Sequence, residues 1–199
     1  ARYHRRAAPK KGHPGYSDLP PALRKVVKVL AACLRLAEGL DRSHAQVVTG
    51  AMNKVRSYDA ETGKLIWEAG GLTMNPIPSP VSGDGLVFLM SGFRGNNLKA
   101  IRYADAKGDI TGTPAIAWTL DRDTPYVPSP ILYDGILYIL KTNNGILSAF
   151  DAKSGKPHYQ GQRFPGVPNV FASPAGAAGR IYFPGREGTT LVIRNSATF

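Results

Sequence analysis

Ser129-Pro-Ile-Leu-Tyr-Asp-Gly-Ile-Leu-Tyr138 is one of three copies of a pattern that decides the fold; the others begin at Ser79 and Ser173. Each copy reads Ser-Pro, four residues, Gly, two residues and an aromatic, and the starts lie 50 and 44 residues apart. A period in this range, with short apolar runs between turn residues, is typical of a repeated small β-sheet, above all a propeller blade. The sequence therefore predicts a mainly β protein built from repeats, in which the glycines of the pattern occupy matching corners.

A second repeated element alternates with the first. Asp59-Ala-Glu-Thr-Gly-Lys followed by Trp67 matches Asp151-Ala-Lys-Ser-Gly-Lys followed by Tyr159, and Asp105-Ala-Lys-Gly with Trp118 further on is a stretched copy. An Asp carboxylate can accept bonds from backbone N–H groups two residues on, and Gly tolerates the positive φ that completes the turn. The aromatic returns on the outgoing strand, where it can wedge between neighbouring sheets. The predicted structural repeat residues are Asp59, Gly63, Trp67, Gly85, Asp105, Trp118, Gly135, Asp151, Gly155, Tyr159 and Gly179.

Short β runs between turn residues fill the chain from about Met52. They are Lys54–Tyr58, Leu65–Glu68, Leu86–Met90, Leu98–Tyr103, Ala115–Leu120, Ile136–Lys141, Ile146–Phe150, Arg180–Phe183 and Thr190–Arg194. Counted as blades, they give the last two strands of one, two whole blades and most of a further one. A closed propeller needs about four to eight blades. We therefore expect an open arc of about three four-stranded antiparallel blades, with free strand edges that allow self-association.

Residues 1–50 have a different pattern. After Pro20-Pro21, apolar residues recur at three- and four-residue steps up to Leu40, which predicts an amphipathic α-helix. The predicted organisation is thus a helical remnant over residues 1–50 and propeller repeats over residues 51–199. Of the formal net charge of +11, residues 1–50 carry the larger part. Such an asymmetry can mark an anionic partner, although no aromatic residues are interleaved for base stacking, which argues against nucleic acid.

Composition narrows the class of protein further. Cys33 is the single cysteine, so the chain can form no internal disulfide and no multi-cysteine metal site. No apolar run is long enough to span a membrane, and the chain opens with neither a start methionine nor a signal peptide. The sequence is therefore interpreted as a fragment or a processed piece, and its compartment is left open.

Residues 51–195 resemble the pyrroloquinoline-quinone-like (PQQ-like) β-propeller repeat proteins. The residues that carry this are Ser57-Tyr-Asp-Ala-Glu-Thr-Gly-Lys-Leu-Ile-Trp67 and Ala149-Phe-Asp-Ala-Lys-Ser-Gly-Lys-Pro-His-Tyr159. The resemblance implies that the pattern docks blades together, and it covers both quinoprotein dehydrogenases and non-catalytic assembly scaffolds. It also implies a periplasmic or secreted location. The dehydrogenases use a vicinal cysteine pair, and Cys33 lies outside the repeats, so this pair is missing.

Residues 1–48 resemble the C-terminal region of the exopolyphosphatase / guanosine-pentaphosphate phosphohydrolase (Ppx/GppA) family. The match rests on Ala1-Arg-Tyr-His-Arg-Arg6, His13-Pro14 and Leu34-Arg-Leu-Ala-Glu-Gly-Leu-Asp-Arg-Ser-His44. That family's phosphoryl-transfer part is not in this sequence, and the resemblance implies a cytoplasmic location for this segment. Two such halves in one chain indicate a chimera, a gene-model artefact or a design, and neither half is complete.

The loops sort onto two rims, because strands alternate in direction within a blade. One rim carries the hairpin and Asp turns, which repeat; the opposite rim carries loops that vary between copies, where binding on a rigid scaffold belongs. The candidate binding rim comprises Arg94, Asn96, Asp121, Arg122, Asp123, Asn143, Arg163 and Arg186. No catalytic, cofactor-binding or metal residue is predicted.

The leading hypothesis is a non-catalytic scaffold that binds a protein or a small ligand on one propeller rim. Two alternatives stay open. One is a quinoprotein-type oxidoreductase fragment, which would take PQQ with calcium; the other is a polyphosphate- or nucleotide-phosphate-binding remnant in residues 1–50.

Overall fold

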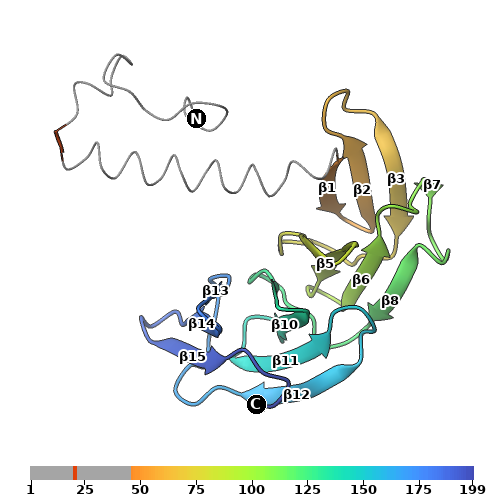
Figure 1. Cartoon of the computed structure of the whole chain (residues 1–199). Helices are drawn as coiled ribbons and strands as arrows, with labels where there is room; N and C mark the ends of the chain where they lie inside the picture. The colour runs from red at the N-terminus through yellow and green to blue at the C-terminus, as the bar shows by residue number, and fades with distance from the viewer. Residues whose placement is uncertain (1–19, 22–45) are drawn as a thin grey trace. The chain divides into compact units, whose positions relative to one another are not determined.

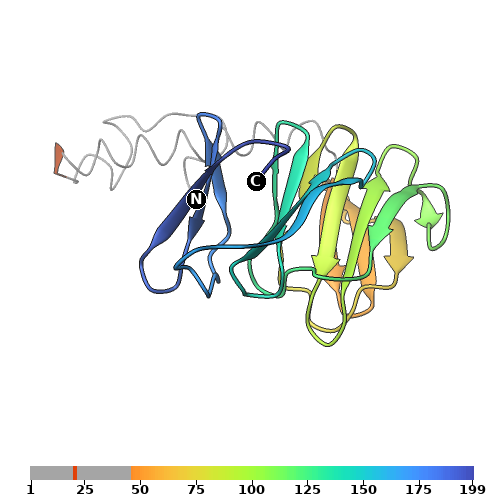
Figure 2. The ribbon, with the colours of Figure 1, turned by 90° about the horizontal axis from the view of Figure 1, so that it is seen from below.

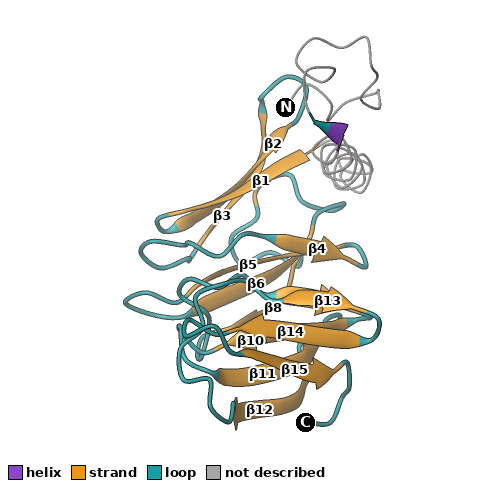
Figure 3. Ribbon diagram, turned by 90° about the vertical axis from the view of Figure 1, so that its left-hand side faces the viewer, coloured by secondary structure: helices purple, strands orange, loops and turns teal. Residues whose placement is uncertain are grey.

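The computed structural model describes residues 20–21 and 46–199, and the helix predicted after Pro21 lies outside this part of the chain. The chain divides into two compact units, Ala1–Gln46 and Val47–Phe199. Within residues 46–199 every regular element is a β-strand, so the prediction of a mainly β protein is confirmed (Figures 1 and 3).

The strands form four sheets, numbered here in chain order. Sheet 1 has the order β1-β2-β3-β7, sheet 2 β4-β5-β6-β8, sheet 3 β12-β11-β10-β9, and sheet 4 β13-β14-β15. The bounds are β1 Gln46–Ala51, β2 Lys54–Asp59, β3 Leu65–Gly70, β4 Val81–Gly83, β5 Leu86–Ser91, β6 Asn97–Arg102, β7 Gly108–Asp109, β8 Ile116–Leu120, β9 Ile131–Tyr133, β10 Ile136–Leu140, β11 Ile146–Asp151, β12 Pro157–Arg163, β13 Ala175–Ala177, β14 Arg180–Pro184 and β15 Thr190–Arg194. The count of about three four-stranded blades is therefore confirmed, with a three-stranded fourth.

Sheet 1 differs from the sequence-based expectation. Its strand β1 begins at Gln46, so residues 46–50, predicted to belong to the helical segment, form a strand. The stretch contains Thr49 and Gly50 and lacks a clear apolar alternation, which is why it was not predicted. The sheet also gains β7, a two-residue strand from the stretched copy that pairs in parallel with β3 through Trp67 and Gly108.

The core lies between the sheets, which stack face to face in chain order (Figure 2). Alternate side chains of each strand point to the preceding and the following sheet, as the two-residue period of a strand requires. Val87 and Leu89 of β5 pack against sheet 1, whereas Phe88 and Met90 of the same strand pack against sheet 3. A third cluster joins sheets 3 and 4 around Tyr138. Strand β5 is buried on both faces, so it reads as a continuous apolar run.

The corners of the Ser-Pro hairpins match one another. Gly85, Gly135 and Gly179 have φ values of 78°, 77° and 70°, and each follows the first strand of its sheet. Only glycine adopts this region at no steric cost. The three repeated glycines therefore mark equivalent positions in sheets 2, 3 and 4.

The first strands of neighbouring sheets approach one another closely. A methyl group on Gly83 of β4 would come within 2.5 Å of Leu132 in β9, and one on Gly176 of β13 would meet the ring of Tyr133 at 2.3 Å. Side chains at these two positions would push the sheets apart, so glycine is required where the sheets converge.

The face of sheet 1 that points away from sheet 2 is polar. Glu68 binds Lys54 at 2.8 Å and Arg56 at 3.2 Å, and these bonds lower the pKa of the carboxyl group. The equivalent faces of sheets 2, 3 and 4 are built from apolar side chains such as Leu89, Ile139 and Phe183. Sheet 1 therefore ends the apolar stack of the described unit.

Candidate functional site

The Asp turn of sheet 1 is closed by its own side chains. Asp59 Oδ1 accepts bonds from the backbone N–H groups of Glu61 (3.1 Å) and Thr62 (2.7 Å) and from the Thr62 hydroxyl (2.7 Å). The N–H of Gly63 donates to the Asp59 carbonyl, and that of Asp59 to the Lys64 carbonyl. The Thr62 hydroxyl is the main cause that lowers the pKa of Asp59. The turn is thus a structural corner, as its repetition suggested.

The turn of sheet 3 repeats this geometry. Asp151 Oδ1 accepts from the backbone N–H (2.8 Å) and the hydroxyl (2.6 Å) of Ser154, which lowers the pKa of Asp151 in the same way. Asp151 N–H donates to the Lys156 carbonyl and Gly155 N–H to the Asp151 carbonyl. Ser154 therefore makes the same two hydrogen bonds to the Asp carboxylate that Thr62 makes in sheet 1.

The stretched copy follows a different course. The Asp105 N–H donates to the Arg102 carbonyl, but the carboxylate that organises the segment belongs to Asp109, whose Oδ1 accepts from the N–H (2.9 Å) and the hydroxyl (2.6 Å) of Thr111. Thr111 Oγ1 in turn accepts from Gly70 N–H at 2.9 Å. The extra residues thereby bind the segment to the end of β3 in the preceding sheet.

Each repeated aromatic lies against the next sheet. Trp118 of β8 donates from Nε1 to the Ala152 carbonyl at 2.9 Å, and a methyl group on Gly155 would meet its indole at 2.6 Å. Trp67 is fully buried between sheets 1 and 2. Tyr159 contacts Phe199 edge-on with ring centroids 5.5 Å apart, and burial raises its pKa. Trp118 therefore packs against the neighbouring turn, between sheets 2 and 3.

The serines of the Ser-Pro pattern are linked from sheet to sheet. Ser79 N–H donates to Ser129 Oγ at 2.9 Å, and Ser129 N–H donates to Ser173 Oγ at 3.0 Å. The hydroxyls of Ser129 and Ser173 each accept the backbone donor of the preceding copy, which gives these two serines a structural role.

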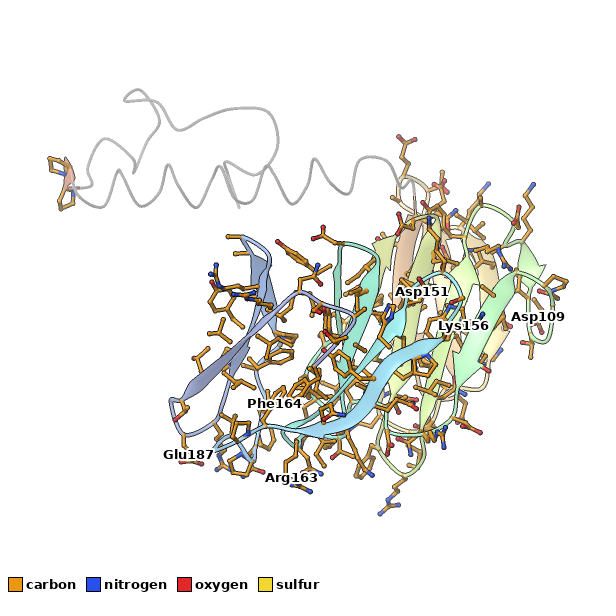
Figure 4. The ribbon with its side chains drawn as sticks, turned by 60° about the horizontal axis from the view of Figure 1, so that its bottom comes forward. Asp109, Asp151, Lys156, Arg163, Phe164 and Glu187 are labelled. Atoms are coloured by element: carbon orange, nitrogen blue, oxygen red, sulfur yellow. The ribbon has the colours of Figure 1, made fainter. Side chains whose placement is uncertain are left out.

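The two rims lie at opposite ends of the strands. Figure 4 shows Asp109, Asp151 and Lys156 at one end and Arg163 and Glu187 at the other. We call the first the turn rim, comprising the hairpin and Asp turns. The second is the loop rim, comprising residues 92–96, 121–126, 141–145, 163–171 and 185–188.

The loop rim is organised by a buried threonine. Thr124 Oγ1 donates to the Ser91 carbonyl at 2.7 Å, and both its N–H and its hydroxyl bond Asn96 Oδ1 at 3.0 Å. The Thr124 carbonyl accepts from Thr142 N–H of sheet 3. Thr142 has φ 53°, a region that β-branched residues seldom occupy. The segment before β9 therefore ties two neighbouring sheets together on this rim.

The candidate rim residues fall into two groups. Asn96 bonds Thr124, and Asp123 forms an ion pair of 2.8 Å with Lys141, so both support the scaffold. Asn143 fixes the segment between β12 and β13, because its backbone carbonyl accepts a hydrogen bond from Val170 N–H. The exposed residues left for a partner are Arg94, Asp121, Arg122, Arg163 and Arg186.

Two of these arginines lie over aromatic rings that the sequence analysis did not single out. Arg94 is 5.5 Å from the ring centroid of Phe93, which stacks on Tyr126 with centroids 4.9 Å apart. Arg186 is 5.6 Å from the ring centroid of Phe171, a side chain that is 42% exposed. Phe93 precedes Arg94 directly in the sequence, so this contact could have been found there. The pairs Phe93–Tyr126 and Phe171–Arg186 are brought together only by the fold.

The turn rim holds a hollow of about 340 Å³ between sheets 2 and 3, lined by Asp84, Asp134, Gly135, Ile136, Asp151, Lys153 and His158. Among the described residues, no three His, Cys, Asp or Glu side chains gather so that they could hold a metal ion. No helix in the described part is long and apolar enough to cross a membrane.

The family match and the solved structures both include BamB. Residues 51–198 match the family described as outer membrane protein assembly factor BamB. Among curated proteins, none is significantly similar to this chain in sequence. The family match begins at residue 51, so it leaves the resemblance of residues 1–48 to the Ppx/GppA family, and with it the predicted chimera, without support.

Solved structures share the fold at low sequence identity. The crystal structure of BamB from Moraxella catarrhalis has a TM-score of 0.52 and 17% identity, over 78% of this chain and 44% of that one. The computationally designed Ika8 protein has a TM-score of 0.51 and 14% identity, over 76% of this chain and 43% of that one. The designed Ika4 protein has a TM-score of 0.50 and 12% identity, over 77% of this chain and 87% of that one. This chain therefore spans less than half the length of the solved BamB.

Proposed function

The chain belongs to the family of the outer membrane protein assembly factor BamB, and on that basis we propose that it is a non-catalytic scaffold that binds a protein partner through the loop rim. The family name suggests a partner from the machinery that assembles outer membrane proteins, and hence a location in the periplasm. No cofactor takes part in this function.

The observation that carries the proposal is the pair of exposed arginine–aromatic contacts, Arg94 over Phe93 and Arg186 over Phe171. Arginine and aromatic side chains dominate the binding energy of protein interfaces. Aromatic rings bury a large area with few rotatable bonds, and arginine adds planar hydrogen bonding and stacking. The ring holds the arginine in place before a partner arrives, and each such contact contributes about 0.5–1 kcal/mol at an exposed site.

The two rims also differ in how their polar groups are used. On the turn rim, the Asp59 and Asp151 carboxylates are satisfied by their own turns. On the loop rim, Arg122 and Arg163 are exposed, as are Arg94 and Arg186. Binding groups therefore concentrate on the loop rim.

The test is site-specific photo-crosslinking in the cell envelope. A photoreactive phenylalanine analogue replaces Phe171, and in a matched control it replaces Leu65, which is 50% exposed beside the turn rim. We expect a discrete protein adduct from position 171 and none from position 65. The double variant Arg94→Ala, Arg186→Ala should weaken the adduct at position 171, whereas Lys153→Ala, Lys156→Ala on the turn rim should leave it intact. Equal crosslinking from positions 65 and 171 would refute a loop-rim interface.

A further inference from the structure

Lys99 of β6 is the buried charge in the stack of sheets. Its side chain lies in the seam between sheets 1 and 2, and only 8% of the residue is exposed. Ile101, two residues on, packs in the core shared by these sheets, which places Lys99 on the same face. A methyl group on Gly71 of the segment that leaves β3 would lie 3.1 Å from Lys99 Nζ. The ammonium group therefore lies directly against that backbone.

The charge of Lys99 is not compensated within the described residues. The ion pairs there join Glu68 to Lys54 and Arg56, and Asp123 to Lys141, and no hydrogen bond from Lys99 Nζ accompanies them. Burial alone lowers the pKa of Lys99, since no carboxylate acts against it. A buried charge without a partner costs free energy that a folded protein normally avoids.

A second polar atom in the same seam is unsatisfied. Asn97 precedes Lys99 by two residues on the same face of β6, and its Oδ1 is buried without a hydrogen-bond partner. Lys99 Nζ, unlike Asn97 Oδ1, is not fully shielded from solvent. The seam thus holds an uncompensated cation and, two residues nearer the loop rim, an unsatisfied acceptor.

The seam ends at the loop rim. Thr73, two residues after Gly71, bonds Ser91 Oγ through its N–H (2.8 Å) and its hydroxyl (2.9 Å) and donates to the Phe93 carbonyl. Met74 forms a β-bridge with Phe93, the ring that carries Arg94. Lys99 therefore lies beneath the same segment that joins one arginine–aromatic pair to sheet 1.

From these contacts we infer that Lys99 is an anion anchor, which takes an Asp or Glu carboxylate from an acidic segment of the partner at the seam between sheets 1 and 2. The inference rests on the proposed function and specifies the chemistry of the partner. The carboxylate supplies the missing counter-charge, and Arg94 on the rim above supplies a second contact for the same acidic segment. A charge-assisted hydrogen bond of this kind is among the stronger contacts of an interface.

The first test uses the free protein. Lys99→Met keeps the apolar stem and removes the uncompensated charge, so we expect it to raise the Tm by a few degrees. The matched control Lys153→Met, an exposed lysine of the turn rim, should leave the Tm unchanged. A fall in Tm for Lys99→Met would show that the ammonium group already stabilises the fold, and would overturn the inference.

The second test measures binding by fluorescence anisotropy. The probe is a labelled peptide that alternates Glu with Phe, and its counterpart carries Gln in place of each Glu. We expect Lys99→Met to weaken binding of the Glu peptide about tenfold, Lys99→Arg to retain it, and Lys153→Met to have no effect. The Gln peptide should bind the wild-type protein as weakly as the Glu peptide binds Lys99→Met.

The outcomes separate this inference from the proposed function. If Arg94→Ala weakens the Glu peptide but Lys99→Met does not, the anchor is refuted while the loop rim stands. Equal affinity of the Glu and Gln peptides for the wild-type protein would likewise refute an anion site at Lys99. Neither result bears on the crosslinking from Phe171, which tests the rim alone.

Discussion

Trp118 in sheet 2 donates a hydrogen bond of 2.9 Å from its indole Nε1 to the carbonyl oxygen of Ala152 in sheet 3. Gly155, in the turn that follows Ala152, faces the same indole. One aromatic thus recognises the next sheet twice, through a hydrogen bond and through a surface that only glycine leaves open. This relationship explains why Asp, Gly and an aromatic recur together in the sequence.

A matched pair of glycines tests the contact. Gly155 and Gly63 have nearly equal φ values of 71° and 69°, but only Gly155 faces Trp118, whereas Gly63 has nothing within 4 Å. Alanine at either position costs about 1–2 kcal/mol of backbone strain. We expect Gly155→Ala to destabilise the protein by about 1–3 kcal/mol more than Gly63→Ala, because its methyl group overpacks the seam. Urea unfolding measures the difference, and equal losses would contradict the docking role.

The serine chain predicts a loss at Ser129. Ser129→Ala removes the acceptor of Ser79 N–H and should destabilise the fold by about 1 kcal/mol. Ser173→Ala should behave alike, since Ser173 Oγ accepts from Ser129 N–H. Ser82→Ala, an exposed serine of β4, provides the control and should leave the urea midpoint unchanged. A neutral Ser129→Ala would mean that the link between sheets contributes nothing to stability.

The Asp turns predict a loss of stability in acid. Hydrogen bonds from Thr62 and Ser154 place the folded pKa values of Asp59 and Asp151 below the ordinary value of 3.8. A carboxyl with a lowered folded pKa contributes stability above its unfolded pKa, and that contribution disappears as the pH falls through the folded value. The double variant Asp59→Asn, Asp151→Asn should therefore be less stable than the wild type at neutral pH, and the gap should close below about pH 3.8.

Urea unfolding across a pH series measures this gap, with Asp121→Asn, an exposed loop carboxylate outside the turns, as control. A gap that stays constant down to the lowest pH would show that the two turn carboxylates do not titrate with folding.

The loop rim depends on Thr124. Thr124→Val keeps the shape but leaves the Ser91 carbonyl without the donor that the hydroxyl supplies, which should cost about 1–3 kcal/mol. The exposed Thr119 of β8 is the control, and Thr119→Val should be close to neutral. If Thr124→Val is equally neutral in urea unfolding, the rim is held instead by the backbone bonds that Thr142 makes with Thr124 and Tyr126.

The sequence predicted the repeats well, because their signals are local. The corners at Gly85, Gly135 and Gly179 require positive φ, and the apolar runs between them form strands wherever both faces are buried. The short strands β7 and β13 escaped prediction, since Gly108–Asp109 and Ala175–Ala177 carry no apolar alternation. Strand β7 also pairs with β3, which lies far away along the chain.

The candidate rim was harder to predict for a related reason. In the sequence, Asn96 and Asp123 look like free polar loop residues. Only the fold shows that Asn96 accepts a hydrogen bond from Thr124 and that Asp123 forms an ion pair with Lys141. Lys99 gave no signal either, because a lysine in an alternating strand normally points to solvent. Whether such a residue is buried depends on the neighbouring sheet, which no local pattern specifies.

The indole seated against the neighbouring turn has an evolutionary consequence. Sheet 2 presents a plug, Trp118, to sheet 3, which presents the matching socket at Ala152 and Gly155. Because the aromatic and the turn belong to one repeating pattern of sequence, duplication of a whole unit adds one plug together with one socket. Blade number in such a protein can therefore change by recombination at the level of the gene, without compensating substitutions elsewhere in the chain.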